Sequence, residues 1–492
     1  MFSQLTHDVV FALSSAPGRA AIALHRITGA GCLNALLPFL RMPTKNLRTG
    51  ATAKRNIDNL GHSQARYATL VNENDEVIDD CLVTFFSGPR SYTGEDTLEI
   101  CAHGNPLITA RLHSLLRQVG FREAKPGEFT QRAFLNGKID LTRAEAIDQL
   151  IHADTQAGIE LARDASDGRI HEVTTELRNQ ITSALAYFEA HIDFADDEVG
   201  SYDAQSQLKQ LSELRANLMR LSETYSTGLK MREGLKIAFL GKPNAGKSSL
   251  YNALLGYERA IVTDIPGTTR DVVEDRLMIG NRDFVLMDTA GVRETVDTVE
   301  QLGVARSISS ASHADIICLV LDVSGCNINT IDSAVTSLAE ELLKPLQSLS
   351  DKKLIIVLTK SDKWQNELLD SFKQKRQLTS FLQQFEVPVL ATSTRKSDIS
   401  ELSKILAQTH DDLLGAGRKS KSAILISKRQ QDKTLLAIAA LDSAIDLVEK
   451  KDFPEKIASM LNSSAHHVSE IVGEIGTEDV LENIFSSFCI GK

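Results

Sequence analysis

Residues 241–250 read GKPNAGKSSL, and this stretch decides the fold of the middle of the chain. It fits the phosphate-loop pattern GxxxxGK[ST] and lies between the strand-like KIAFL and the helix-like SSLYNALL, where the pattern needs to lie. Backbone amides of residues 244–247 can cradle phosphate oxygens, helped by the positive end of the following helix. Lys247 would neutralise the terminal phosphates, and Ser248 would offer an oxygen to Mg²⁺.

Short apolar runs continue on both sides of this loop. They alternate with helix-length segments and occupy residues 236–241, 284–288, 316–322, 354–359 and 387–393. This alternation predicts a doubly wound, mainly parallel sheet, which together with the loop indicates a Ras-like P-loop GTPase domain.

Further motifs follow in the order that a GTPase requires. IPGTTRD supplies Thr269 as a second Mg²⁺ ligand, and DTAG supplies Asp288 and the Gly291 amide. TKSD at 359–362 places Asp362 to accept two hydrogen bonds from guanine, so we expect GTP; Thr359 replaces the more usual Asn and should weaken one supporting contact. The predicted GTP-binding residues are Asn244, Ala245, Gly246, Lys247, Ser248, Ser249, Thr263, Asp264, Ile265, Pro266, Gly267, Thr268, Thr269, Asp288, Thr289, Ala290, Gly291, Thr359, Lys360, Ser361, Asp362, Thr392, Ser393 and Thr394.

Val292 follows DTAG, at the position where Ras-type GTPases have the glutamine that orients the attacking water. Valine has no hydrogen-bonding group, so the chain either does not hydrolyse its nucleotide or does so by other means. An arginine finger or a monovalent cation could offset the charge on the bridging oxygen.

The remaining sequence predicts a multidomain α/β and α protein. Residues 1–136 mix short β-like runs with Gly and Pro turns, which indicates an α+β domain. Residues 137–230 and 412–492 carry helical periodicity, and residues 231–411 form the GTPase domain, so we expect one helical domain into which the GTPase domain is inserted. Two apolar stripes define the expected helix faces: Val173, Leu177, Ile181, Leu185, Phe188 and Ile192, and Leu435, Ile438, Leu441, Ile445 and Val448.

Composition is that of an ordinary soluble protein. The 492 residues are 42% hydrophobic and 24% charged, with a net charge of −11 that argues against a general nucleic-acid coat. Six scattered cysteines indicate a reducing compartment, and no apolar run approaches the length of a membrane span. The acidic run of Asp193, Asp196, Asp197 and Glu198 is typical of a solvated helix end.

The chain closely resembles the MnmE (TrmE) family of tRNA-modification GTPases. The resemblance extends beyond the GTPase motifs to PGRAAIALHRITG, SYTGEDTLEICAHG, KPGEFTQRAFLNGKIDLTRAEAIDQLI and the terminal FSSFCIGK. It implies a homodimer formed through a folate-binding N-terminal domain, which works with an FAD-containing partner of the MnmG (GidA) family on wobble uridine 34 of tRNA. The expected product carries a C5 aminomethyl-type group, carboxymethylaminomethyl or taurinomethyl.

The resemblance also implies roles for individual residues. Folate contacts, to 5-formyltetrahydrofolate or methylenetetrahydrofolate, are expected from Arg26, Glu99, Lys138 and Lys492. K⁺ is expected to bind Asn244 and the backbone carbonyls of Thr263, Ile265 and Thr268. Glu300 is the expected water-orienting residue, with Glu294 as the runner-up, and Cys489 in CIGK is a candidate for the modification chemistry.

Two other functions stay open on the sequence. One is a GTP-dependent switch in RNA or ribosome assembly without modification chemistry, and the other is an interaction protein with a degenerate nucleotide site, which the intact Lys247, Ser248, Thr269 and Asp288 oppose. The opening FALSSAPGR resembles mitochondrial family members, so we expect the mitochondrial matrix, with bacterial cytoplasm as the alternative.

Overall fold

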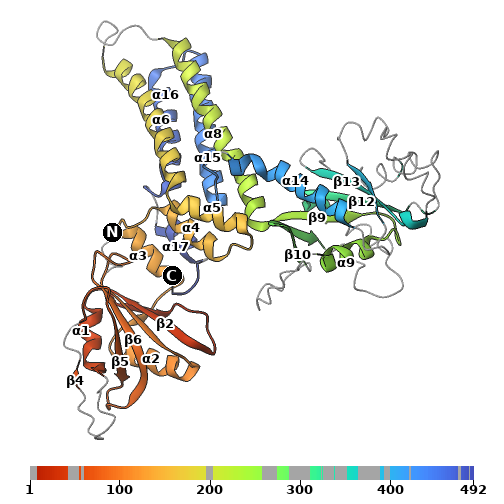
Figure 1. Cartoon of the computed structure of the whole chain (residues 1–492). Coiled ribbons are helices and arrows are strands. Elements are labelled where there is room, and N and C mark those ends of the chain that lie inside the picture. Colours follow the sequence, from red (N-terminus) through yellow and green to blue (C-terminus); the bar gives the residue numbers. More distant parts are fainter. Residues whose placement is uncertain are drawn as a thin grey trace. The chain divides into compact units, whose positions relative to one another are not determined.

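The computed structural model describes most of the chain and divides it into two compact units (Figure 1). The first unit comprises Met1–Ile151, Arg163–Ser222 and Ile426–Lys492, and the inserted unit comprises His152–Ala162 and Glu223–Leu425. The predicted fold class, with an α/β unit inserted into a helical one, is confirmed, whereas the bounds of the four domains stay predictions. The described residues are 8–42, 55–56, 60–194, 203–257, 274–287, 311–322, 324, 337, 352–363, 388–392, 399–419, 423–474, 478–486 and 488–491.

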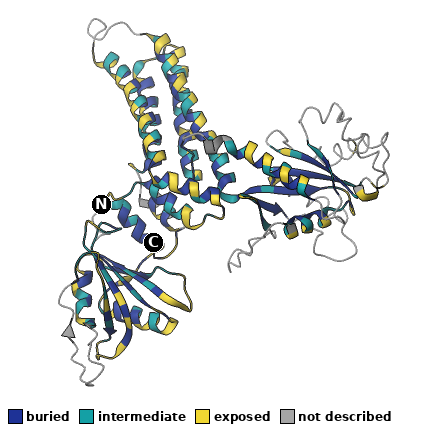
Figure 2. Ribbon diagram, viewed as in Figure 1, coloured by how far each residue is buried: buried dark blue, intermediate teal, exposed yellow. Residues whose placement is uncertain are grey.

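An eight-stranded sheet forms the N-terminal part of the first unit, in the order β4-β3-β5-β6-β7-β2-β1-β8. Its strands are β1 (Val10–Leu13), β2 (Ala20–Thr28), β3 (Leu40–Met42), β4 (Arg55–Asn56), β5 (Ala65–Val71), β6 (Val77–Phe86), β7 (Thr97–Gly104) and β8 (Arg122–Glu123). The helices α1 (Cys32–Leu36) and α2 (Pro106–Gln118) contact β7, and α2 also contacts β6, so both helices cover one face of the sheet. Alternating strand residues such as Ile27, Leu98 and Ile100 fill the core between sheet and helices (Figure 2).

Helices form the rest of the first unit. They are α3 (Glu128–Leu135), α4 (Leu141–Ile151), α5 (Gln156–Ser166), α6 (Arg169–Asp193), α8 (Ala204–Glu233), α15 (Lys428–Glu449), α16 (Pro454–Val472) and α17 (Glu478–Ser486). The boundary between the two units falls within α5 and within α8. The main packing contacts join α15 to α16 and α16 to α6, which brings the C-terminal helices against the earlier helical segment. No helix in the described ranges has the length and apolar character needed to cross a membrane.

The two predicted helix faces are correct at their centres and wrong at one end each. Leu177, Ile181 and Phe188 are buried on α6, but Ile192 is exposed near the end of the helix. On α15 the buried face includes Ile438, Leu441 and Val448, whereas Leu435 points to solvent. Two threonines are also buried on these helix faces: the Thr174 hydroxyl donates to the Ile170 carbonyl, and the Thr434 hydroxyl donates to the Gln430 carbonyl.

A buried carboxylate holds the two helical segments together. Glu145 on α4 accepts hydrogen bonds from Arg429 at 2.8 and 2.9 Å, from Gln430 at 2.6 Å and from the Ser427 hydroxyl at 3.0 Å. Arg429 also donates to the carbonyls of Glu470 and Ile471 at the end of α16. Every partner of this charge is itself hydrogen-bonded, which is the condition under which a buried ion pair is tolerated.

The inserted unit contains a six-stranded sheet in the order β10-β11-β9-β12-β13-β14. Its strands are β9 (Leu235–Leu240), β10 (Glu274–Ile279), β11 (Arg282–Met287), β12 (Ile316–Asp322), β13 (Lys353–Thr359) and β14 (Val389–Ala391), and its helices include α9 (Lys247–Tyr257) and α14 (Ser400–Lys419). All pairings are parallel except the β10–β11 hairpin, as the predicted doubly wound sheet requires. The edge strand β10 was not among the predicted strands.

Candidate nucleotide site and N-terminal cluster

The phosphate-binding loop joins β9 to α9 and is shaped by two left-handed residues. Asn244 has φ 60° and Gly246 has φ 96°, values that asparagine and glycine accept more readily than other residues. Gly241 begins the loop where any side chain would collide with β12, because an added Cβ would lie 2.3 Å from the Val320 carbonyl oxygen. The Leu250 amide donates to the Gly246 carbonyl at 2.9 Å, so regular helix starts directly behind the loop.

Lys247 is folded back over its own loop. Its Nζ donates to the carbonyl oxygens of Gly241 and Lys242 at 2.8 and 2.9 Å, which holds the ammonium over the concave side of the loop. Burial lowers the pKa of Lys247 because it disfavours the charged form. A phosphate at this position would supply the opposite charge that the site lacks, so the loop can bind a polyphosphate.

Thr359 connects the phosphate-binding loop to the base-recognition motif. Its buried hydroxyl lies 2.5 Å from the Ala245 carbonyl oxygen and 3.1 Å from that of Leu321. Threonine therefore keeps one contact of the kind that an asparagine would make, although a hydroxyl has a single hydrogen to donate. This bond places the end of β13, and with it TKSD, directly behind the loop that the sequence assigns to the phosphates.

The rest of TKSD is held by a charge pair. Lys360 adopts φ 60°, and its Nζ donates to Asp322 Oδ2 at 2.5 Å at the end of β12. Burial, the largest single influence, acts to raise the pKa of Asp322, but the hydrogen bonds from Lys360 and Ser324 and the charge of Lys360 together lower it below its ordinary value. Asp362 is exposed two residues further on, where it can meet a base.

Several predicted site residues lie outside the described residues, and their roles stay predictions. They are Thr263, Asp264, Ile265, Pro266, Gly267, Thr268, Thr269, Asp288, Thr289, Ala290, Gly291, Val292, Glu294, Glu300, Ser393, Thr394 and Lys492, together with Asp196, Asp197 and Glu198 of the acidic run. Thr392 is described and buried, with its amide donating to the Leu358 carbonyl at 2.8 Å.

A second cluster forms on the N-terminal sheet around Arg26. Its guanidinium donates to Glu99 Oε1 from Nε at 3.0 Å and from Nη2 at 2.8 Å, across the β2–β7 pairing. The guanidinium carbon also lies 5.5 Å from the ring centre of Tyr92 and 5.8 Å from that of Phe129. The structure thus brings together two of the predicted folate-binding residues and surrounds them with two aromatic rings that the sequence did not single out.

The C-terminal CIGK segment lies against the same cluster. The Gly491 carbonyl accepts from the Ser14 hydroxyl at 2.9 Å and from Arg26 Nη1 at 3.4 Å. Gly491 has φ +93°, and an added Cβ would lie 2.6 Å from the Leu13 carbonyl oxygen, so only glycine fits here. Cys489, two residues earlier, is exposed, and its carbonyl accepts from the Gly127 amide at 3.4 Å.

Lys138 borders the loop that carries Tyr92. Its Nζ donates to the Pro89 carbonyl at 3.0 Å, and its Cγ lies 3.3 Å from the Cβ position of Gly94. The SYTGED segment therefore lies between Lys138 on one side and Arg26 on the other. Tyr92 and Phe129 belong to segments already quoted for their family resemblance, whereas nothing in the local sequence pointed to Ser14.

Known proteins match this chain over nearly its whole length. Residues 141–489 match the family model for the MnmE helical domain, and residues 9–138 match the model for the N-terminus of the GTP-binding protein TrmE. The chain is 35% identical over 486 residues to the tRNA modification GTPase MnmE of Aquifex aeolicus (strain VF5), across 99% of this chain and 100% of that protein. It is 34% identical to the protein of the same name in Clostridioides difficile (strain 630), across 99% of each chain, and 36% identical to that of Akkermansia muciniphila, across 98% of each. The chain therefore belongs to the MnmE (TrmE) family of tRNA modification GTPases.

Proposed function

We propose that this chain hydrolyses GTP and, with an FAD-containing partner of the MnmG (GidA) family, installs a C5 aminomethyl-type group on wobble uridine 34 of tRNA. The observation that carries the GTPase part is the 2.5 Å contact between Thr359 and Ala245, because it joins the phosphate-binding and guanine-binding motifs into one site. The relatives are tRNA modification GTPases, and this supports the tRNA-modifying part.

The modification part is tested by deleting the gene and measuring the wobble nucleosides of total tRNA by mass spectrometry. Loss of the C5 modification, restored by the wild-type chain but not by Cys489→Ser, supports both the reaction and the role of Cys489. Unchanged nucleosides together with altered ribosome profiles would favour the alternative, a GTP-dependent assembly switch.

We propose that hydrolysis depends on K⁺ rather than on a glutamine after DTAG. Asn244 stands in the phosphate-binding loop with φ 60°, a left-handed conformation that asparagine adopts more readily than most residues, and its amide oxygen is a suitable ligand for a cation. GTP turnover should be faster in KCl than in NaCl and should rise with protein concentration. Equal rates in the two salts would refute the cation.

Glu300 is the proposed water-orienting residue. Glu300→Ala should nearly abolish turnover at saturating GTP while the affinity for a fluorescent GTP analogue stays unchanged. Glu294→Ala is the matched control, since it removes an equal charge from the same segment. Full activity in Glu300→Ala with loss in Glu294→Ala would reverse the assignment.

We propose that the Arg26 cluster binds a reduced folate, 5-formyltetrahydrofolate or methylenetetrahydrofolate. The guanidinium and the flanking rings of Tyr92 and Phe129 suit a planar ligand with an anionic tail, and Glu99 suits the donor edge of a pterin. Calorimetry with 5-formyltetrahydrofolate should show weaker binding for Arg26→Ala and Glu99→Gln. Arg215→Ala, which lies on α8, is the control that should bind as the wild type does.

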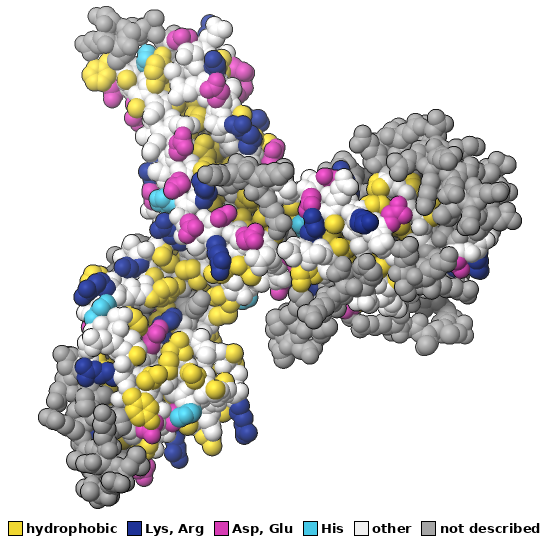
Figure 3. All heavy atoms as spheres, in the orientation of Figure 1, with side chains coloured by type: hydrophobic (Ala, Val, Ile, Leu, Met, Phe, Trp, Pro, Cys, Tyr) yellow, Lys and Arg dark blue, Asp and Glu magenta, His cyan; other side chains and the backbone are white. Residues whose placement is uncertain are grey.

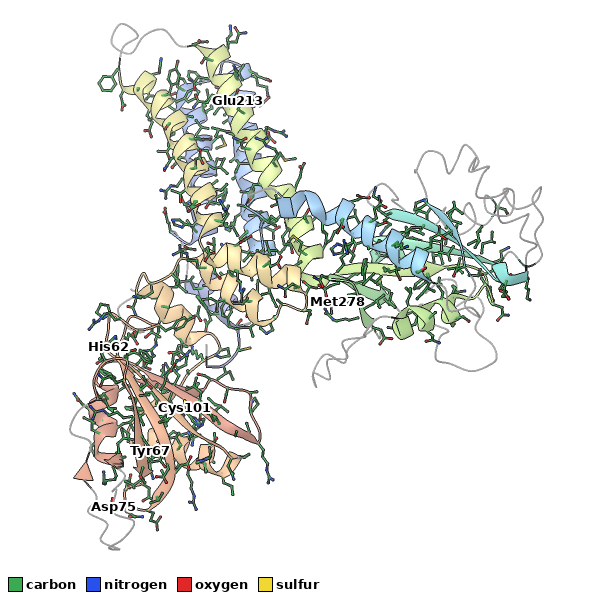
Figure 4. The ribbon with its side chains drawn as sticks, in the orientation of Figure 1. His62, Tyr67, Asp75, Cys101, Glu213 and Met278 are labelled. Carbon is green, nitrogen blue, oxygen red and sulfur yellow. The ribbon has the colours of Figure 1, made fainter. Side chains whose placement is uncertain are left out.

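We propose that a second copy of the chain covers the uncovered face of the N-terminal sheet. The strand register places Tyr67, Leu82, Cys101 and Leu24 in one row across β5, β6, β7 and β2 (Figure 4). Tyr67 is 53% and Leu82 47% exposed, and α1 and α2 pack on the other face. Hydrophobic side chains gather over this part of the molecule in Figure 3.

Leu82→Glu should therefore convert a dimer into a monomer in light scattering. Val77→Glu, on the same strand and also exposed but outside the row, should leave the dimer intact. A dimer that survives Leu82→Glu would show that this face is not the interface. The compartment stays a prediction: the mitochondrial matrix is our expectation, and the bacterial relatives are consistent with the alternative of bacterial cytoplasm.

A further inference from the structure

The β10–β11 hairpin occupies a particular place in the GTPase unit. In sequence it lies between residues 263–269 and 288–291, the two segments that the sequence assigns to the Mg²⁺ ion and the γ-phosphate. It is also tied to the phosphate-binding helix, because the Tyr251 hydroxyl donates to Asp275 Oδ2 at 2.6 Å. The hairpin is thus tied to the phosphate-binding helix by one hydrogen bond and adjoins both predicted segments in sequence.

The same hairpin contacts the start of α5 through two charged side chains. Arg276 Nη2 on β10 donates to Asp154 Oδ2 at 2.6 Å, and the Gln156 amide donates to Asp283 Oδ2 on β11 at 3.2 Å. Gln156 is the first residue of α5. An amide at this position has no acceptor within the helix, and the helix dipole is positive there, so both favour a nearby negative charge. Figure 4 labels Met278 on the same hairpin.

The first turn of α5 is also packed against the last turn of α8. The Thr155 hydroxyl donates to the Met231 carbonyl and accepts from the Gly158 amide at 2.8 Å. An added Cβ on Gly158 would lie 3.1 Å from the Cα of Arg232, so the two helices touch without space for a side chain. α8 runs into β9 and the phosphate-binding loop. The start of α5 therefore contacts both the helix that leads into this loop and the β10–β11 hairpin.

α5 is one continuous helix, and its residues from Arg163 onward belong to the first unit. A displacement of its first turn is therefore carried along hydrogen-bonded backbone into the segment that leads to α6. The other side of the hairpin is held to α14, where Arg282 donates to both carboxylate oxygens of Asp411 at 2.8 and 2.6 Å. This second ion pair connects the same hairpin to α14 instead of α5.

We propose that Arg276 and Asp283 transmit the nucleotide state of the GTPase site to α5 through Asp154 and the Gln156 amide. Arg276 and Asp154 are 32% and 44% exposed, so their pair contributes little to stability. The pair matters for coupling instead. If the hairpin takes a different position in each nucleotide state, the free energy of its contacts with α5 differs between the states, and coupling between two sites requires such a difference. This inference rests on the proposed GTP binding at residues 244–248.

Hydrogen exchange of the full-length protein, with GDP or with a non-hydrolysable GTP analogue in KCl, tests the proposal. In the wild type, peptides that cover residues 156–193 should exchange differently in the two states. The Arg276→Ala/Asp283→Ala variant should lose at least about half of that difference, whereas its affinity for a fluorescent GDP stays unchanged. Arg282→Ala, which breaks an equal ion pair on the same hairpin, should keep the difference.

Charge reversal separates coupling from simple destabilisation. Arg276→Asp should reduce the nucleotide-dependent difference, and adding Asp154→Arg should restore it, because the pair is re-formed with opposite signs. An undiminished difference in the double alanine variant, or no difference in a nucleotide-bound wild type, would overturn the coupling. A chain that binds no guanine nucleotide would overturn the proposed function as well, so the two failures are distinguishable.

Discussion

At the scale of single residues, a hydroxyl at position 359 holds the nucleotide site together. The buried Thr359 oxygen donates one hydrogen bond, and the Ala245 carbonyl at 2.5 Å is its nearer acceptor. An asparagine amide would offer two hydrogens at the same place. At this position the phosphate-binding loop of this chain is therefore held by a single donated hydrogen bond, whereas an asparagine could donate two.

Thr359→Val removes that donor without changing the size of the side chain. Because the Ala245 carbonyl then loses its buried partner, we expect the affinity for GDP to fall by about tenfold, equivalent to about 1.4 kcal/mol. Titration of a fluorescent GDP measures the change. Thr359→Ser keeps the hydroxyl and should bind nearly as the wild type does; equal affinities for the Val and Ser variants would show that the bond is not needed.

A buried histidine pair predicts a pH dependence of stability. His25 Nδ1 lies 3.2 Å from His113 Nε2 under α2, and burial, followed by the nearby His113, lowers the pKa of His25 to about 4. The unfolded chain would bind a proton near pH 6.5, whereas the folded chain would not until about pH 4. The stability from this group is complete above about pH 6.5 and is lost as the pH falls towards 4, by about 3 kcal/mol at most.

Urea unfolding followed by circular dichroism at pH 7.5 and pH 5 measures this effect. His25→Gln, which cannot titrate, should lose less stability between the two pH values than the wild type. His313→Gln removes an exposed histidine of the inserted unit and should behave as the wild type does. The same pH dependence in all three proteins would contradict the assignment to His25.

At the scale of elements, the sequence predicted most of the inserted sheet and much of the helical part. The apolar runs that became β9, β11, β12 and β13 are mostly buried, and together with β14 they are nearly continuous in hydrophobic residues, which made them recognisable. β10 was missed because it is an edge strand in which Glu274, Asp275 and Arg276 precede the apolar residues. Ile192 and Leu435 were misplaced because helical spacing defines a face but does not say where the partner helix ends.

The candidate sites were predictable only where they are local. The phosphate-binding loop is a contiguous pattern, so its Lys247 and Ser248 could be named directly. The contact of Thr359 with Ala245 spans 114 residues, and that of Arg26 with Gly491 spans 465 residues. No local pattern encodes such contacts, because they arise only when separate elements pack together.

The junction between α3 and α17 predicts the effect of a single methyl group. Gly127 has φ +65° at the start of α3, and an added Cβ would lie 2.6 Å from the Phe485 carbonyl oxygen at the end of α17. Gly127→Ala should displace α17 and expose the C-terminal residues to carboxypeptidase. The loss in the free energy of unfolding should exceed about 1–2 kcal/mol, which is the cost of the left-handed backbone alone.

Gly120→Ala is the matched control for this junction. Gly120 has φ +95°, yet nothing lies within 4 Å of its added Cβ, so the variant tests the backbone cost without the collision. Thermal unfolding should rank the wild type first, Gly120→Ala second and Gly127→Ala last. Equal carboxypeptidase sensitivity in the two variants would mean that α17 does not need the close approach.

At the scale of the whole molecule, the first unit is assembled from chain segments on both sides of the inserted unit. The buried Glu145, with its four hydrogen bonds to Ser427, Arg429 and Gln430, is the polar centre of that assembly. The inserted unit has its own sheet and does not use this contact. We therefore expect the two units to respond separately to damage at Glu145.

Glu145→Ala leaves Arg429 buried without its carboxylate, which should cost the first unit about 3–5 kcal/mol. Urea unfolding should show an earlier transition, while GDP binding by the folded inserted unit stays unchanged. Arg215→Ala breaks the exposed pair with Asp442 and should leave the midpoint of that transition nearly unchanged. Loss of GDP binding in parallel with the first transition would show that the two units unfold as one.

The packing of α15 and α16 against α6 also sets an order of events during synthesis. The strands of the N-terminal sheet and those of the inserted sheet each come from a contiguous part of the chain, so both sheets can form as the chain leaves the ribosome. The apolar face of α6 stays uncovered until residues 428–472, which form α15 and α16, have been synthesised. The Arg26 cluster is completed later still, by the Gly491 carbonyl, so the proposed folate site can form only after residue 491 has been made.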